Sequence, residues 1–237
     1  MTYHLAIGDR TNSSWSLRGW LLFAGFGLPV EIDRARMKSQ AFRDMLDAYK
    51  PAQLVPAMRI DAGGQSSVVW DSLAMAETLA ERHPERGFWP ADPALRAMAR
   101  SMVAEMHAGF TDLRTDCTMN LRHTYPDFRP SAAVMADVER IDRLWTGAFA
   151  ARDAAGMEGN WLFGAYSLAD VFYAPVASRI TTYALPVSEP AAAYVTRVIE
   201  SGPFREWREA GLAEKYVQPG YDLDLEPQPW PEPCPAI

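Results

Sequence analysis

The sequence has few of the features that mark an exported, membrane-bound or disulfide-bonded protein. Among its 237 residues there are only two cysteines, Cys117 and Cys234, too few and too far apart for a disulfide scaffold. The longest apolar stretch, residues 19–30, is interrupted by Pro29, whereas a membrane helix needs roughly 20 apolar residues. The first ten residues lack the cationic start and apolar run of an export signal. We therefore expect a soluble cytosolic protein with no membrane partner.

Positive charge and metal-binding patterns are also scarce. Lys and Arg number 23 against 30 Asp and Glu, a formal net charge of −7, which is the wrong sign for wrapping nucleic acid. The four histidines have no metal-ligand spacing, and neither cysteine belongs to a CxxC pair. No Walker sequence, complete dinucleotide fingerprint or Gly-x-Ser-x-Gly motif occurs. With 49% hydrophobic residues the chain is typical of a globular protein, for which we expect no nucleic-acid partner and no metal.

The first 83 residues alternate between strand and helix patterns. The expected order is strand, helix, strand, short helix, β-hairpin and helix, over residues 3–7, 15–26, 30–33, 42–49, 57–70 and 72–83. An order of βαβ and then ββα in so short a stretch predicts a small α/β domain over residues 1–83.

The remainder of the chain is predicted to be helical. Residues 84–94 hold three prolines and no periodicity, which indicates an interdomain linker. Apolar residues then recur every three or four positions from Leu95 to Leu121, which predicts one long helix, and a second follows over 134–156. Further helical patterns, which complete an all-α domain over 95–216, cover 168–183, 190–200 and 203–214.

The last segment, residues 217–237, contains six of the 18 prolines, four acidic residues and no basic one. It cannot form a core of its own. We expect it to be either disordered or extended over the body of the protein.

Hydroxyl groups gather where the first strand is followed by the first helix, in the sequence Thr-Asn-Ser-Ser-Trp-Ser-Leu-Arg at 11–18. Free N–H groups and the helix dipole favour an anion at such a position. A thiolate is such an anion, and a serine hydroxyl donating to sulfur would lower the thiol pKa from its reference value of about 8.5. The alternative is simple N-capping, for which Ser and Asn are the usual residues.

Two further segments have the same double interpretation. A cis peptide before Pro56, at the entrance to a strand, would turn the main-chain groups of Val55 toward a peptide-like ligand, although a turn proline is the simpler alternative. Asp71 and Ser72 begin a helix, so Asp71 suits an ammonium group, while Ser72 and the free N–H groups suit a carboxylate. The alternative is again a helix cap.

In this order and setting, the three segments resemble the glutathione S-transferase family. The chain is most similar to the bacterial branch with the motif Ser-Ser-Trp-Ser-Leu-Arg, here at 13–18, which is related to the serine-using zeta class. The resemblance covers nearly the whole chain, including Phe-Trp-Pro at 88–90 and Ser-Leu-Ala-Asp at 167–170, a capping box with a structural role. It implies a thioredoxin-like N-terminal domain, an all-α C-terminal domain, glutathione as co-substrate and a homodimer.

The resemblance also implies roles for individual residues in binding glutathione. Val55 would bind its cysteinyl backbone with Pro56 in cis, and Asp71 and Ser72 would hold the γ-glutamyl amine and carboxylate. Ser13 would activate the thiol.

Some positions leave alternatives open or depart from the family pattern. Ser14 is the alternative to Ser13. Leu54 occupies a position where Lys or Gln often reaches the glycyl carboxylate, so Gln53 or Lys50 could substitute for it. Arg18 is expected to have a structural role.

The expected reaction is attack of the glutathione thiolate on a small hydrophobic electrophile. The electrophile would lie against the long helices, where Met102, Met106, Phe110 and Arg114 share one face, although core packing explains the apolar three equally well. One alternative is glutathione-dependent isomerisation or peroxide reduction at the same site. Another is a binding or regulatory protein that kept only the fold.

Overall fold

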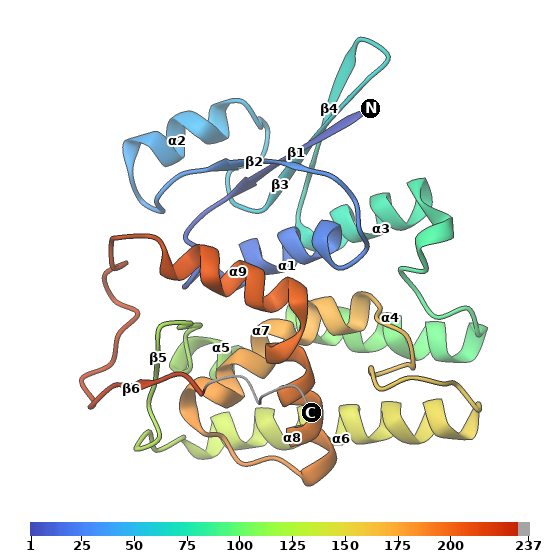
Figure 1. Cartoon of the computed structure of the whole chain (residues 1–237), viewed down its shortest axis with the longest axis vertical. Helices are drawn as coiled ribbons and strands as arrows, with labels where there is room; N and C mark the ends of the chain where they lie inside the picture. The colour runs from blue at the N-terminus through green and yellow to red at the C-terminus, as the bar shows by residue number, and fades with distance from the viewer. Residues whose placement is uncertain (232–237) are drawn as a thin grey trace.

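The structure is a computed structural model that describes residues 1–231 (Figure 1). A mixed four-stranded sheet has the order β2-β1-β3-β4. β1 pairs parallel with β2 and antiparallel with β3, and β3 pairs antiparallel with β4. The strands and their helices are β1 (Thr2–Ile7), α1 (Ser14–Ala24), β2 (Glu31–Arg34), α2 (Gln40–Asp47), β3 (Ala57–Ala62), β4 (Gln65–Trp70) and α3 (Ser72–Arg82).

Alternation along the strands assigns the two faces of the sheet. Leu5 and Ile7 of β1 belong to the main core with residues of α1 and α3. Ala6, between them, belongs to a smaller cluster with Leu46 of α2. Because successive strand residues point to opposite faces, α1 and α3 cover one face and α2 covers the other. This is the thioredoxin-like arrangement that the sequence predicts.

Helices form the rest of the molecule and lie below the sheet in Figure 1. α7 is their centre, because nearly all of its residues are buried and it packs against α1, α4 and α8. Among the described residues no helix is long and apolar enough to cross a membrane. The elements are η1 (Pro84–Arg86), α4 (Pro93–Ala108), α5 (Thr111–Asp116), β5 (His123–Thr124), α6 (Ala132–Ala154), α7 (Leu168–Tyr183), α8 (Glu189–Glu200), α9 (Gly202–Leu212) and β6 (Gln228–Pro229).

The prediction of one helix from Leu95 to Leu121 is wrong. α4 ends at Ala108, and Phe110 has a left-handed backbone conformation with φ of 56°. Arg114 Nη1 donates to the freed carbonyl oxygens of His107 and Gly109, at 3.3 and 3.2 Å. The apolar spacing continues across the break because Phe110 remains buried in the core, so periodicity alone could not locate it.

A capping box starts α7, as the sequence predicts. The main-chain N–H and the hydroxyl of Ser167 both donate to Oδ2 of Asp170, at 2.8 and 3.0 Å. Leu162 N–H and the Tyr194 hydroxyl donate to Oδ1, at 3.2 and 3.1 Å. Burial raises the pKa of Asp170 to about 6, and these four hydrogen bonds oppose the shift. Asp170 therefore joins the start of α7 to the preceding loop and to α8.

Asp170→Ala is expected to lower the free energy of unfolding by about 2 kcal/mol, because buried N–H groups lose their acceptor. Asp92→Ala is the matched control, since Asp92 caps α4 through a single bond from Leu95 N–H and its loss should cost about 1 kcal/mol. Urea unfolding measures both. Equal losses would contradict a joining role for Asp170.

The described part of the C-terminal segment lies extended against the body. β6 pairs with β5, and the buried Trp230 donates from Nε1 to the carbonyl oxygen of His123 at 3.1 Å. Nearer α9, the Tyr216 hydroxyl donates to Asp9, and Asn120 Nδ2 donates to Asp222 at 2.8 Å. Residues 232–237 of the predicted tail lie outside the described residues.

Candidate functional site

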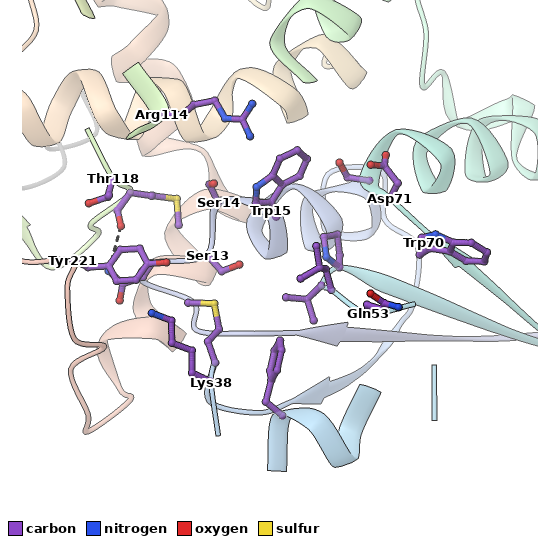
Figure 2. A pocket seen from close by; sticks show the side chains of 18 of the residues that line it. Ser13, Ser14, Trp15, Lys38, Gln53, Trp70, Asp71, Arg114, Thr118 and Tyr221 are labelled. Atoms are coloured by element: carbon purple, nitrogen blue, oxygen red, sulfur yellow. Dashed lines mark hydrogen bonds between the residues drawn. The ribbon is translucent and has the colours of Figure 1, made fainter. Parts of the chain in front are cut away.

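A cavity of about 1040 Å³ opens between the sheet and the helices (Figure 2). One wall comes from the loops at the ends of β1 and β4 and before β3, and the other comes from α5, the residues after it and α7. The residues that the sequence assigns to thiol activation or glutathione binding line this cavity: Ser13, Ser14, Gln53, Val55, Pro56, Asp71 and Ser72.

Ser13 both caps α1 and faces the cavity. Its Oγ accepts the main-chain N–H of Ser16 at 3.2 Å and lies 2.8 Å from Ser16 Oγ. The Ser13 side chain is largely buried but contributes to the lining. The two interpretations of this segment, capping and a site for an anion, are therefore compatible in one residue.

Ser14 is the first residue of α1, and its hydroxyl has a different environment. Its Oγ lies 3.5 Å from Arg179 Nη2, which donates to it. In Figure 2 Ser14 lies toward Arg114 and the helices, whereas Ser13 lies on the side of the sheet and Lys38.

The Val55–Pro56 peptide is cis, as expected. Pro56 packs directly on α1 because Gly19 has no side chain. A Cβ at Gly19 would lie 2.5 Å from Cβ of Pro56, so only glycine permits this approach. Val55, which is half-buried, borders the cavity beside the first residues of β3.

The Asp71 carboxylate and the Ser72 hydroxyl can both form further hydrogen bonds. Asp71 has an unusual φ of 74° and caps α3 through Oδ1, which accepts Leu73 N–H at 2.8 Å. Its Oδ2 lies 3.2 Å from His107 Nε2. Ser72 Oγ is buried and has no hydrogen-bond partner within the described chain. Because a buried hydroxyl without a partner is costly, this atom suggests a ligand contact.

Three arginines give the cavity a positive potential that the net charge conceals. Arg114 and Arg179 line the cavity, and Arg18 lies behind them between the rings of Trp15 and Phe172. Burial, followed by repulsion from Arg179 and Arg114, lowers the pKa of Arg18 to about 9. Burial also lowers the pKa of Arg179 to about 10, so both remain cationic at neutral pH. In residues 1–231 none of the three forms an ion pair with a carboxylate.

The lining residues that sequence reasoning missed include three with polar side chains, Lys38, Arg179 and Tyr221. Arg179 had a usable signal, because it is a lone charge in the apolar run of residues 171–180 and buried charges are rare. Tyr221 lies in the proline-rich segment, where nothing in the sequence distinguishes it. It lines the cavity together with Thr118 and Ser13, and burial raises its pKa, so its hydroxyl stays a neutral donor.

Two expectations about the lining need correction. Met102 and Met106 of α4, which packs against α6 and α7, and Phe110 at the start of α5 are core residues outside the cavity lining. Of that group only Arg114 lines the cavity. Lys50 is exposed, pairs with Asp47 at 2.9 Å and is not a lining residue either. No cluster of three or more His, Cys, Asp or Glu that could hold a metal ion occurs in the part of the chain that the structure describes.

Comparisons with known proteins agree with the geometry. Residues 12–82 match the family model of the glutathione S-transferase N-terminal domain. The maleylacetoacetate isomerase of Pseudomonas aeruginosa is 28% identical over 177 residues, which cover 70% of this chain and 76% of that protein.

Solved structures share the fold. A glutathione transferase homologue from Burkholderia gl BGR1, with bound glutathione, superposes with a TM-score of 0.63 at 20% identity and covers 90% of this chain and 100% of its own. Maleylacetoacetate isomerase from Anaeromyxobacter dehalogenans, with bound dicarboxyethyl glutathione and citrate, has a TM-score of 0.57 at 22% identity and covers 94% and 98%. The chain thus has an N-terminal region that matches the glutathione S-transferase family model, shares the fold of solved glutathione transferases, and is similar in sequence to a maleylacetoacetate isomerase.

Proposed function

We propose that this protein is a glutathione transferase that uses the Ser13 hydroxyl to stabilise the thiolate of bound glutathione. The observation that carries the proposal is the convergence of three separate segments, each with polar groups of the required sign, on one cavity. Retention on immobilised glutathione, followed by turnover of a generic chloronitrobenzene, tests it. Absence of retention would contradict the proposal, whereas retention without turnover would favour a binding protein.

The peptide backbone of glutathione fits the sheet side of the cavity. Main-chain groups of Val55, beside the cis Pro56, would pair with its cysteinyl residue. Asp71 would bind the γ-glutamyl amine, and the unpartnered Ser72 hydroxyl at the start of α3 would bind the adjacent carboxylate. Lys38 and Gln53, both in the lining, would take the glycyl carboxylate that Leu54 cannot reach.

Ser13 is favoured over Ser14 as the group that activates the thiol. Ser13 is the N-cap of α1 and lies on the sheet side of the cavity, where the peptide backbone of glutathione would bind, whereas Ser14 lies toward the helices and accepts from Arg179. The dipole of α1 also favours an anion beside Ser13. Donation to the sulfur favours its charged form and so lowers the thiol pKa. At neutral pH more of the bound glutathione is then the nucleophile.

The second substrate is proposed to carry a carboxylate rather than to be purely hydrophobic. The helix side of the cavity presents Arg114 and Arg179 together with Thr111, Thr115 and Thr118. Two cations that form no ion pair with a carboxylate among residues 1–231, in a half-enclosed site, suit an acid far better than a neutral hydrocarbon. The bound dicarboxyethyl glutathione and citrate of the Anaeromyxobacter isomerase agree with this substrate class.

A second candidate, glutathione-dependent isomerisation, is favoured by the Pseudomonas relative. The thiolate would add to an activated carbon–carbon double bond, rotation would follow about the resulting single bond, and elimination of the thiolate would restore the double bond. The same arginines would hold the acid throughout. Glutathione is regenerated in this reaction and consumed in transfer, so its stoichiometry separates the two. The homodimer and the cytosolic location remain predictions, and light scattering tests the former.

Asp71→Asn is expected to weaken glutathione binding about 10-fold. The γ-glutamyl amine would lose its negatively charged partner, and in the complex this ion pair is covered from water by the bound glutathione. Asparagine keeps an oxygen for the Leu73 N–H and tolerates positive φ, so the fold should persist. Asp92→Asn, at the N-cap of α4, is the matched control. Isothermal calorimetry with glutathione measures both, and equal affinity of the two variants would remove Asp71 from the site.

A further inference from the structure

Ser16 is a buried hydroxyl directly behind Ser13. It is fully buried and is not among the residues that line the cavity. Its Oγ accepts the main-chain N–H of Gly8 at 3.0 Å and lies 2.8 Å from Ser13 Oγ. Its own main-chain N–H donates to Ser13 Oγ at 3.2 Å. Ser16 therefore cannot touch a substrate, but it contacts the proposed activating group twice.

The hydrogen-bond capacity of the two hydroxyls limits how they can be arranged. Each hydroxyl offers one hydrogen and two lone pairs. Gly8 N–H fills one lone pair of Ser16. In the structure Ser13 Oγ donates to Ser16 Oγ, and the two hydroxyls can exchange these roles because each has its own hydrogen and a lone pair left to accept with. When Ser16 donates, Ser13 accepts two hydrogen bonds, from Ser16 N–H and from Ser16 Oγ. The hydrogen of Ser13 is then free to point into the cavity.

We propose that Ser16 is a positioning residue that turns the Ser13 hydrogen toward the glutathione sulfur. The inference rests on the proposed function, specifically on Ser13 as the activating group. When a thiolate is present, Ser13 donates to sulfur and Ser16 donates to Ser13, so the two hydroxyls form a chain that begins at Gly8 N–H. Each bond in such a chain polarises the next, which makes Ser13 a stronger donor than an isolated serine.

A purely structural role for Ser16 makes a different prediction. In that case its hydroxyl only satisfies the Gly8 N–H, and its loss would lower stability without changing the thiol of bound glutathione. The distinguishing quantity is therefore the thiol pKa, read from the ultraviolet absorbance of the thiolate while glutathione is bound. Thermal unfolding of the same variants measures the structural part separately.

The experiment compares the wild type with Ser13→Ala, Ser16→Ala and the double variant. We expect Ser13→Ala to raise the thiol pKa by about one to two units and Ser16→Ala by about half a unit to one unit. The double variant should match Ser13→Ala alone, because Ser16 acts through Ser13. Should Ser16→Ala fail to fold, Ser16→Cys keeps an acceptor for Gly8 N–H and nearly the same volume but donates weakly. Its pH profile of kcat/KM should shift upward in the same way.

The outcomes separate this inference from the proposed function. An unchanged thiol pKa in Ser13→Ala would remove Ser13 as the activating group and the inference with it. A raised value in Ser13→Ala with a wild-type value in Ser16→Ala would overturn the positioning role alone. A double variant whose shift equals the sum of the single shifts would also overturn it, because Ser16 would then act independently of Ser13.

Discussion

Replacement of Ser13 by alanine is expected to lower kcat/KM at neutral pH by about 10- to 100-fold. A hydrogen bond to a charged group is worth about 1.5 to 3 kcal/mol, which corresponds to a rise of about one to two units in the thiol pKa. At a pH below the thiol pKa, a rise of about one to two units lowers the fraction of bound glutathione that is thiolate by about 10- to 100-fold. Stopped-flow measurement of kcat/KM against pH with a neutral electrophile detects the change.

The pH profile gives the sign of the effect. Activity rises with pH as the thiol ionises and levels off above its pKa, so the inflection should move upward in Ser13→Ala while the plateau changes less. Ser131→Ala is the matched control, because Ser131 caps α6 by accepting Val134 N–H at 3.2 Å, the same bond length as at Ser13. Ser14→Ala tests the alternative serine. An upward shift in Ser14→Ala with none in Ser13→Ala would assign activation to Ser14.

Arg114→Met should lower kcat/KM for a carboxylate-bearing electrophile about 100-fold, because the substrate loses a charge-assisted hydrogen bond in a half-enclosed site. Turnover of a neutral electrophile should fall much less. Steady-state kinetics with a matched pair of acidic and neutral electrophiles measures the difference. An equal loss for both substrates would show that Arg114 supports the fold or the thiolate and does not select acids.

Arg100→Met is the control for Arg114→Met. Both arginines stack on a tryptophan, Arg114 on Trp15 at 5.0 Å and Arg100 on Trp89 at 5.4 Å. Arg100 does not line the cavity. Because Arg114 also binds the carbonyl oxygens at the end of α4, urea unfolding of both variants separates lost stability from lost recognition. Arg100→Met should leave the preference for acids unchanged.

The sequence predicts the sheet and its helices well because their signals are local. Alternation in β1, the hairpin of β3 and β4, and the caps at Asp71 and Ser167 each depend on a few neighbouring residues. The sequence does not predict the break after α4, because Phe110 lies at the break and is still buried. The apolar spacing therefore continues where the backbone changes direction. Local patterns therefore identify elements better than the turns that tertiary packing imposes.

The glutathione side of the site was predictable for a different reason than the second-substrate side. The segments around Ser13, Pro56 and Asp71 are short motifs that follow β1, precede β3 and follow β4. These three strands are neighbours in the sheet, so the motifs lie close together. On the opposite wall the sequence predicts only Arg114. Arg179 and Tyr221 lie far from it along the chain and join it only through the packing of α5, α7 and the C-terminal segment. Local sequence patterns do not show which distant residues pack together.

The described part of the C-terminal segment, residues 217–231, is held to the body by polar contacts such as Asn120 with Asp222 and by the buried Trp230, and it places Tyr221 in the cavity wall. Binding free energies are reciprocal. Any ligand that touches Tyr221 therefore holds the segment in place by the same free energy by which the segment strengthens the binding of that ligand. A protease should then cleave the segment more slowly as more ligand is bound in the cavity. The cleavage rate therefore reports the fraction of protein with ligand bound, even for a ligand that is not turned over.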